Sequence, residues 1–115
     1  MTAEPTPTGR LLAIVAHRDD NVATLLADVP EGGATADLAA QDLKILGSIH
    51  CTGPIPFGHK VAIRTIARTA HVVKFGAVLG TATADIAVGQ HAHTHNVASA
   101  RLGAPASVGG SDARY

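Results

Sequence analysis

The fold class is decided by residues 58–86, which read GHKVAIRTIARTAHVVKFGAVLGTATADI. Short runs rich in β-branched residues alternate in this stretch with turn-forming glycine and polar residues, a pattern typical of short strands in a compact β domain. The runs predict strands at Val61–Ile66, Val72–Phe75 and Val78–Ile86. Runs of this length are much shorter than the roughly 18 uncharged apolar residues that a membrane helix requires.

Two apolar runs closer to the N-terminus, Leu11–Ala16 and Ile45–Ile49, predict further strands. The two ends of the chain, residues 1–9 and 101–115, are rich in proline, glycine and hydroxyl-bearing residues, so we expect them to be flexible tails. Residues 10–100 are therefore interpreted as a single domain.

The residues after the first apolar run predict one short helix. A carboxylate at Asp19 or Asp20 suits a helix N-terminus, because it accepts free backbone N–H groups and lies at the positive end of the helix dipole. Val22 and the leucine pair that follows it then fall at helical spacing. The segment from 34 to 46 is expected to be a loop. The predicted fold class is thus mainly β with one short helix.

The composition excludes several classes of partner. Nine Lys+Arg balance nine Asp+Glu with no basic run, so the sequence offers no nucleic-acid surface, and no stretch is apolar enough for a membrane span. The single cysteine, Cys51, cannot form an internal disulfide, which together with the polar N-terminus indicates a cytoplasmic protein. With 22 alanines and only three aromatic residues the core is thin, so we expect assembly with a partner or as a homo-oligomer.

Three of the seven histidines, His91, His93 and His95, alternate with other residues. On a strand such positions share one face, with neighbouring Cα atoms about 6.6 Å apart. Two neighbouring imidazoles could then bind one metal ion with further ligands from elsewhere, whereas three from one straight strand would be strained. Imidazole suits iron, zinc, nickel or copper, and the spacing does not choose among them. A polar strand face, or histidines hydrogen-bonded in a subunit contact, would give the same pattern.

A second candidate is the tripeptide Gly58-His59-Lys60, which follows a proline-containing turn and precedes an expected strand. Gly58 permits a positive φ or close backbone approach. His59 is a candidate general acid or base, and Lys60 is a cation that could hold a carboxylate. A plain turn with two solvated side chains is the alternative.

Three isolated polar residues complete the candidates. Lys74 interrupts an apolar strand. A charged residue at such a position either protects an edge strand from pairing with another chain or has a function. His17 and Asn21 flank the expected helix N-terminus, where backbone N–H groups could meet a substrate carboxylate. A catalytic role for Cys51 is not expected, because its neighbour His50 would point to the opposite face of a strand.

Taken in order, five blocks of the sequence resemble the N-terminal region of the altronate and galactarate dehydratases. The resemblance covers about residues 11–99 and implies a SAF domain with a β-clip fold, which occurs either fused to a larger catalytic region or as a separate small subunit. The blocks are His17–Ala23, Ile55–Ala62, Val73–Gly76, Gly80–Ile86 and His91–Asn96.

The resemblance implies that the chain is the small subunit of a hydro-lyase that dehydrates a sugar acid of the altronate or galactarate type to a 2-keto-3-deoxy acid. It also implies a divalent metal, usually Fe²⁺, with Zn²⁺ or Mn²⁺ as other choices, and a separate larger catalytic subunit without which the chain would be inactive. The small subunit of a sulfolactate sulfo-lyase is an alternative within the same group. A non-catalytic β-clip module that binds a small acid is an alternative from another class.

Residue by residue, the resemblance assigns the alternating histidines to the metal and the nearby cations to the substrate. His93 and His95, with His91 as a third, would be metal ligands or would lie next to the metal. The side chains expected to face the substrate carboxylate or to assist proton transfer are His59, Lys60 and Lys74.

Overall fold

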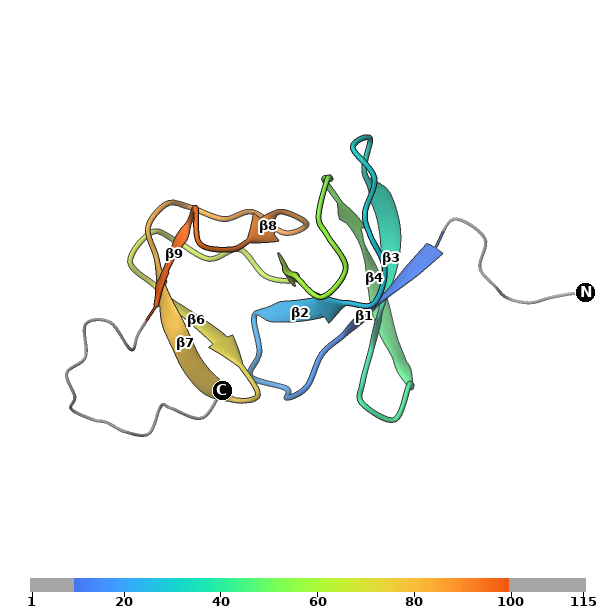
Figure 1. Cartoon of the computed structure of the whole chain (residues 1–115). Helices are drawn as coiled ribbons and strands as arrows, with labels where there is room; N and C mark the ends of the chain where they lie inside the picture. Colours follow the sequence, from blue (N-terminus) through green and yellow to red (C-terminus); the bar gives the residue numbers. More distant parts are fainter. Residues whose placement is uncertain (1–9, 100–115) are drawn as a thin grey trace, which may run out of the picture.

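The computed structural model describes residues 10–99, which form nine strands in two sheets (Figure 1). One sheet has six strands in the order β4-β3-β1-β2-β5-β8, and the other has three in the order β6-β7-β9. Both predicted tails, residues 1–9 and 101–115, lie outside the described residues. The strands are β1 (Arg10–Ile14), β2 (Val22–Leu25), β3 (Ala34–Ala39), β4 (Ile45–Cys51), β5 (Lys60–Ala62), β6 (His71–Lys74), β7 (Ala77–Ala82), β8 (His91–Ala92) and β9 (Val97–Ser99).

The prediction of a single, mainly β, SAF-like domain is confirmed, but the predicted short helix is wrong. Its residues form β2, which pairs with β1 on one side and with β5 on the other. Val22 and Ala23 are both fully buried, as in a central strand covered on both faces, and such a strand has no alternation that distinguishes it from a short helix. Within residues 10–99 no helix is long and apolar enough to cross a membrane.

The Asp20 carboxylate, expected to cap that helix, holds a turn instead. It is fully buried and accepts hydrogen bonds from the backbone N–H groups of Ala16, His17 and Gly76. The last of these bonds joins the β1–β2 connection to the β6–β7 turn. A buried carboxylate with three backbone donors is well satisfied, so Asp20 fixes the position of one sheet relative to the other.

The segment from 34 to 46, expected to be a loop, contains β3. This strand runs parallel to β1 and antiparallel to β4. Its sequence, ATADLA, has no valine or isoleucine and is half alanine, so it lacks the β-branched aliphatic residues that marked the predicted strands. Ala36 and Ala39 are fully buried there.

Two isolated β-bridges join loops of the domain. Val29 pairs with Ile55, and Ile66 pairs with Ile86, each through two reciprocal backbone hydrogen bonds of 2.7–3.1 Å. All four side chains are at most 2% exposed.

The two bridges are also alike in having an aspartate directly before one of the bridged residues. Asp28 accepts a hydrogen bond from the N–H of Phe57, and Asp85 accepts one from the N–H of Arg68, both at 2.8 Å. In each case the donor lies two residues after the bridged isoleucine. The two turns are therefore held in the same way in different halves of the domain.

The core is divided into two clusters, and β2 and β5 contribute to both. Val61 packs in a cluster with Leu25, whereas the next residue, Ala62, packs in a second cluster with Val22. Consecutive residues of a strand point to opposite faces, so the β2–β5 pair forms the wall between the clusters. β5 also begins directly after His59, and this links the candidate site to both halves of the core.

We predict that Ile86→Ala lowers the free energy of unfolding by about 2–5 kcal/mol, because it leaves a cavity in a cluster with few large side chains. The matched control, Ile45→Ala, removes the same atoms from a residue that is 54% exposed and should change stability by no more than about 0.5 kcal/mol. Urea unfolding of the three proteins measures both values. Equal losses in the two variants would contradict the assignment of the core.

Candidate functional site

The pairing of β5 with β8 brings three histidines together. Lys60 lies opposite Ala92 in this antiparallel pair. The same register, carried one residue further, places His59 opposite His93, and His91 is two residues before His93. Because alternate residues of a strand share a face, and opposed residues lie on the same face, the three imidazoles project to one side of the β5–β8 pair.

The three rings are in contact. The ring centroids of His59 and His93 are 4.2 Å apart and the rings are stacked, while His91 lies 5.0 Å from His59 and 5.2 Å from His93. The Nδ1 atom of His59 is 2.9 Å from the Nε2 atom of His91. One nitrogen from each of the three rings falls within 4.8 Å of the others, close to the separation of about 3–4 Å that nitrogens bound to one ion at about 2.0–2.1 Å adopt.

The histidine segment is a strand that ends in a turn, in contrast to the straight strand expected from the sequence. β8 stops at Ala92, and the Asn96 side chain then accepts a hydrogen bond from the N–H of His93 and donates one to the carbonyl of His91. These bonds curl the chain so that the ring of His93 lies over His59. His95 follows the bend, and its ring lies 5.2 Å from His91 but is not one of the three that converge.

The environment favours neutral imidazoles. Burial lowers the pKa of His91 from 6.5 to about 4, and the neighbouring imidazoles add to this effect. Partial burial also lowers the pKa of His93, with smaller contributions from His59, His95 and Lys60. A neutral imidazole keeps the lone pair that a metal ion needs, so the cluster is poised to bind a cation at neutral pH.

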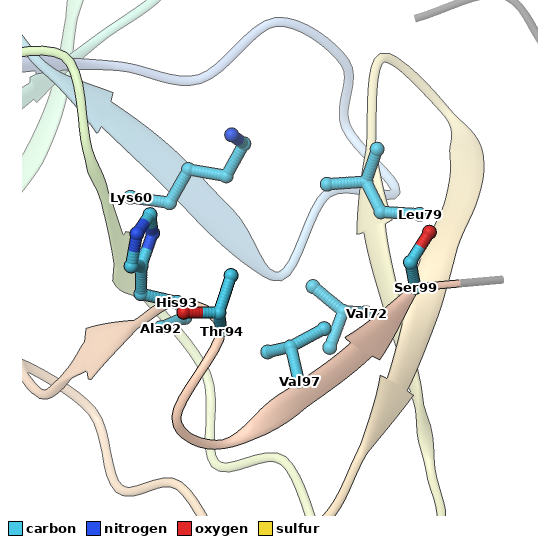
Figure 2. Close-up of a pocket in the computed structure, with 8 residues that line it drawn as sticks. All are labelled: Lys60, Val72, Leu79, Ala92, His93, Thr94, Val97 and Ser99. Atoms are coloured by element: carbon cyan, nitrogen blue, oxygen red, sulfur yellow. The ribbon is translucent and has the colours of Figure 1, made fainter. Parts of the chain in front are cut away.

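Lys60 and Lys74 lie near the cluster but in different settings. Lys60 is half-buried and lines a cavity together with His93 (Figure 2). Lys74 is only 3% exposed, donates a hydrogen bond from Nζ to the carbonyl of Ile14 at 3.0 Å, and lies 5.1 Å from the centroid of the Phe75 ring. Burial lowers the pKa of Lys74, the Asp20 carboxylate opposes this, and Lys60 adds to it.

The setting of Lys74 fits both of the alternatives considered from the sequence. β6 is an edge strand of its sheet, and an inward-pointing charge on such a strand discourages pairing with another chain. The influence of Lys60 on its pKa also places the two cations within electrostatic reach of each other. Its role in substrate binding stays a prediction.

Asn21 and His17 are placed by contacts within the domain. The side chain of Asn21 accepts a hydrogen bond from the N–H of Val73 and donates one to the carbonyl of His71, so its amide joins the start of β2 to β6. His17 is exposed, and its Nδ1 accepts a hydrogen bond from the N–H of Asp19. The helix N-terminus that was expected to meet a substrate carboxylate here does not exist, and substrate binding by these two residues stays a prediction.

Comparison with known proteins identifies the domain. The sequence model of the altronate/galactarate dehydratase SAF domain matches residues 11–100, which is nearly all of the described structure. The chain belongs to this family. The five blocks quoted from the sequence all fall within the matched range.

Among curated relatives of this SAF domain are two altronate dehydratases and a sulfo-lyase subunit. The chain is 39% identical over 80 residues to altronate dehydratase of Escherichia coli and 36% identical over 81 residues to that of Bacillus subtilis, covering 70% of this chain but 15% of each dehydratase. It is 31% identical over 88 residues to the (2R)-sulfolactate sulfo-lyase subunit alpha of Chromohalobacter salexigens, covering 76% of this chain and 94% of that subunit. The chain thus spans a small part of the dehydratases and almost all of the subunit.

Two features of the SAF domain were not found from the sequence. His59 was assigned to acid–base chemistry, because its position opposite His93 depends on the β5–β8 register, which nothing in the local sequence specifies. The role of Asn96 was also missed, although asparagine side chains commonly hydrogen-bond to nearby backbone groups in turns. Cys51 is fully buried and burial raises the pKa of its thiol, which agrees with the expectation that it is not a nucleophile.

We predict that the His91 imidazole titrates near pH 4 in an NMR titration of the folded chain. Because the unfolded chain binds this proton at its ordinary pKa near 6.5, the unfolded state gains protons first as the pH falls, and the free energy of unfolding decreases between about pH 6.5 and 4. His91→Gln should show a shallower decrease over the same range, measured by urea unfolding. A His91 titration near pH 6.5 would show that the ring is not held as described.

Proposed function

We propose that this SAF domain supplies a metal-binding and anion-binding half-site to a lyase that eliminates water from a hydroxylated carboxylic acid. The observation that carries the proposal is the convergence of nitrogens from His59, His91 and His93 within 4.8 Å, together with a cavity that His93 and the cation Lys60 both line. The family is named after the altronate and galactarate dehydratases, and this supports elimination of water as the reaction class.

The residues present fit a divalent metal ion. Three imidazoles from two adjacent segments, with no fourth protein ligand among the described groups that converge, match the three-ligand pattern of catalytic sites that keep an open position. The family resemblance makes Fe²⁺ the first candidate and Zn²⁺ the second. Mn²⁺ is disfavoured, because it prefers oxygen ligands to imidazole. When bound, such an ion supplies a Lewis acid that stabilises negative charge developing on the substrate oxygens.

The proposed metal site would give His59 a role other than the acid–base role expected from the sequence. The nitrogen of His59 that faces His91 would bind the ion, and the other ring nitrogen would then carry the proton, so the ring has no free lone pair for acid–base work. The base that removes the proton next to the carboxylate is therefore assigned to a larger catalytic chain. Lys60 donates hydrogen bonds to the substrate carboxylate, and Asn96 holds His91 and His93 at the spacing that the ion requires.

In the proposed reaction the C–H bond next to the carboxylate breaks and its proton goes to the base. The bond from the neighbouring carbon to its hydroxyl oxygen then breaks, the hydroxyl leaves as water after taking up a proton, and the enol formed tautomerises to a 2-keto-3-deoxy acid. The relatives named altronate dehydratase favour an aldonate or aldarate as the substrate. This half-site alone would be inactive.

A second candidate is the small subunit of a sulfolactate sulfo-lyase, in which sulfite leaves in place of water. The chain aligns with 94% of one such subunit, so a domain of this size exists as a separate polypeptide in that enzyme. The word subunit in its name also supports a larger partner chain. In the dehydratases the corresponding region is a small part of one long polypeptide, which leads to the same expectation of further catalytic residues outside this domain.

We predict that the full chain binds one equivalent of Fe²⁺ or Zn²⁺ per molecule at neutral pH, measured by calorimetry with each ion. His93→Ala should weaken the binding at least about tenfold, because one of three ligands is lost. His71→Ala is the control, since this exposed histidine on β6 lies outside the cluster. Unchanged affinity in His93→Ala would exclude the tri-histidine site.

We further predict turnover when the chain is combined with the larger dehydratase chain of its organism and Fe²⁺. An aldonate or aldarate should yield a 2-keto-3-deoxy acid, detected with a carbonyl reagent, and His93→Ala should lower the rate by about a hundredfold or more while circular dichroism shows an intact fold. Release of sulfite from sulfolactate would favour the second candidate. If neither product forms with the larger chain, the domain is a binding module and the lyase proposal fails.

A further inference from the structure

The two sheets have four edge strands among the described residues, and three of these edges are protected against pairing with another chain. β8 has two residues and β9 has three, so each offers few backbone groups for pairing. β6 carries the inward-pointing, buried Lys74. Short edge strands and inward-pointing charges are two of the devices by which proteins prevent edge-to-edge association.

The fourth edge strand, β4, has neither protection. With seven residues, Ile45–Cys51, it is the longest of the described strands, and it contains no proline and no Asp, Glu, Lys or Arg. A bulge opposite the Leu38–Ala39 step disturbs its N-terminal end, but Gly47–Cys51 follow in regular register against β3. No described strand pairs with the other side of β4, so its outward backbone groups form an open edge.

Exposed apolar side chains accompany this edge. Leu43, Ile45 and Leu46 are 60%, 54% and 55% exposed, and every residue from 41 to 48 is exposed. Figure 1 shows the turn between β3 and β4 at the end of a hairpin that extends beyond the neighbouring strands. Apolar side chains gathered beside an open strand edge mark a surface that becomes buried on association.

The order of the strands separates this edge from the candidate site. β4 and β8 are the outer strands of the six-stranded sheet, with four strands between them. At about 4.8 Å for each strand, the two edges are roughly 24 Å apart along the sheet. The larger catalytic chain is expected at the histidine cluster beside β8, so covering β4 is not part of its proposed role.

A second copy of the chain fits the β4 edge. Two β4 strands related by a two-fold axis run antiparallel, so each copy supplies the backbone partners that the other lacks. The N-terminal end of one β4, next to the exposed Lys44, then lies beside the C-terminal end of the other. The turn of residues 30–33 contacts that end at Cys51 and carries the exposed Glu31. The paired ends are therefore opposite in charge, while Asp42 lies two residues further from β4 than Lys44.

We propose that two copies of this chain associate by antiparallel pairing of their β4 strands, which joins the two six-stranded sheets into one. The exposed Ile45 and Leu46 of each copy then pack beside the C-terminal end of the other β4. Each histidine cluster stays at an outer edge of the joined sheet, so both half-sites are open to a larger chain. The proposal concerns a surface that the proposed function does not use, and neither depends on the other.

The mass of the full chain in solution tests the proposal. Sedimentation equilibrium at micromolar concentration, without metal and without a partner chain, should give twice the 11.6 kDa of the chain. Ser48→Lys adds a charge at an exposed position in the middle of β4, where the two copies approach each other, so the dimer should dissociate at least about tenfold more readily. The matched control, Thr65→Lys, adds the same charge at an exposed position between β5 and β6 and should leave the dimer unchanged.

Crosslinking locates the axis without disturbing the edge. Ser48→Cys should be joined into a covalent dimer by a short bismaleimide, whereas Thr65→Cys should not, and the native Cys51 is fully buried and protected from the reagent. A monomer at every concentration measured would overturn the proposal. So would a dimer that persists in folded Ser48→Lys protein, or equal crosslinking of the two cysteine variants. If the chain alone is monomeric and Ser48→Lys instead abolishes binding of the larger catalytic chain, the β4 edge belongs to that chain and the dimer is refuted.

Discussion

The register of β5 against β8 is the constraint on which the site depends. Only when Lys60 lies opposite Ala92 does His59 come to lie beside His93, on the face that also carries His91. A shift of one residue in a strand pair moves every side chain to the other face, so the cluster would be lost completely rather than weakened. Since β8 is only two residues long, its register must be fixed by contacts other than the hydrogen bonds between β5 and β8.

Two kinds of contact fix it. The Asn96 side chain closes the turn after β8, and the backbone bridge between Ile66 and Ile86 holds the chain that leads into it. The second bridge, between Val29 and Ile55, does the same for the approach to β5. Strands too short to be stable alone are thus aligned by buried turns on both sides, in a core whose largest fully buried side chains are leucine, isoleucine and valine.

The sequence specifies the fold class and most strands, because β-branched runs between turn residues are a local signal. The sequence does not reveal an element whose structure depends on tertiary packing. Val22 to Leu25 fits a helix or a buried strand equally well, and the alanine-rich β3 is a strand because its backbone pairs with β1 on one side and β4 on the other. The number and spacing of the histidines made them candidate site residues. The contact of His59 with them depends on strand pairing across 32 residues of chain.

The alanine-rich interior has a consequence for how such a domain can diversify. Ala13, Ala23 and Ala36 are fully buried in one cluster, where an added methylene group would force neighbouring backbone apart. Interior positions are therefore closed to enlargement, while the rim of the cavity, with Thr94 and Ser99, is exposed and can vary at little cost. New ligand preferences on this scaffold would arise by exchange of rim residues, with the same interior retained.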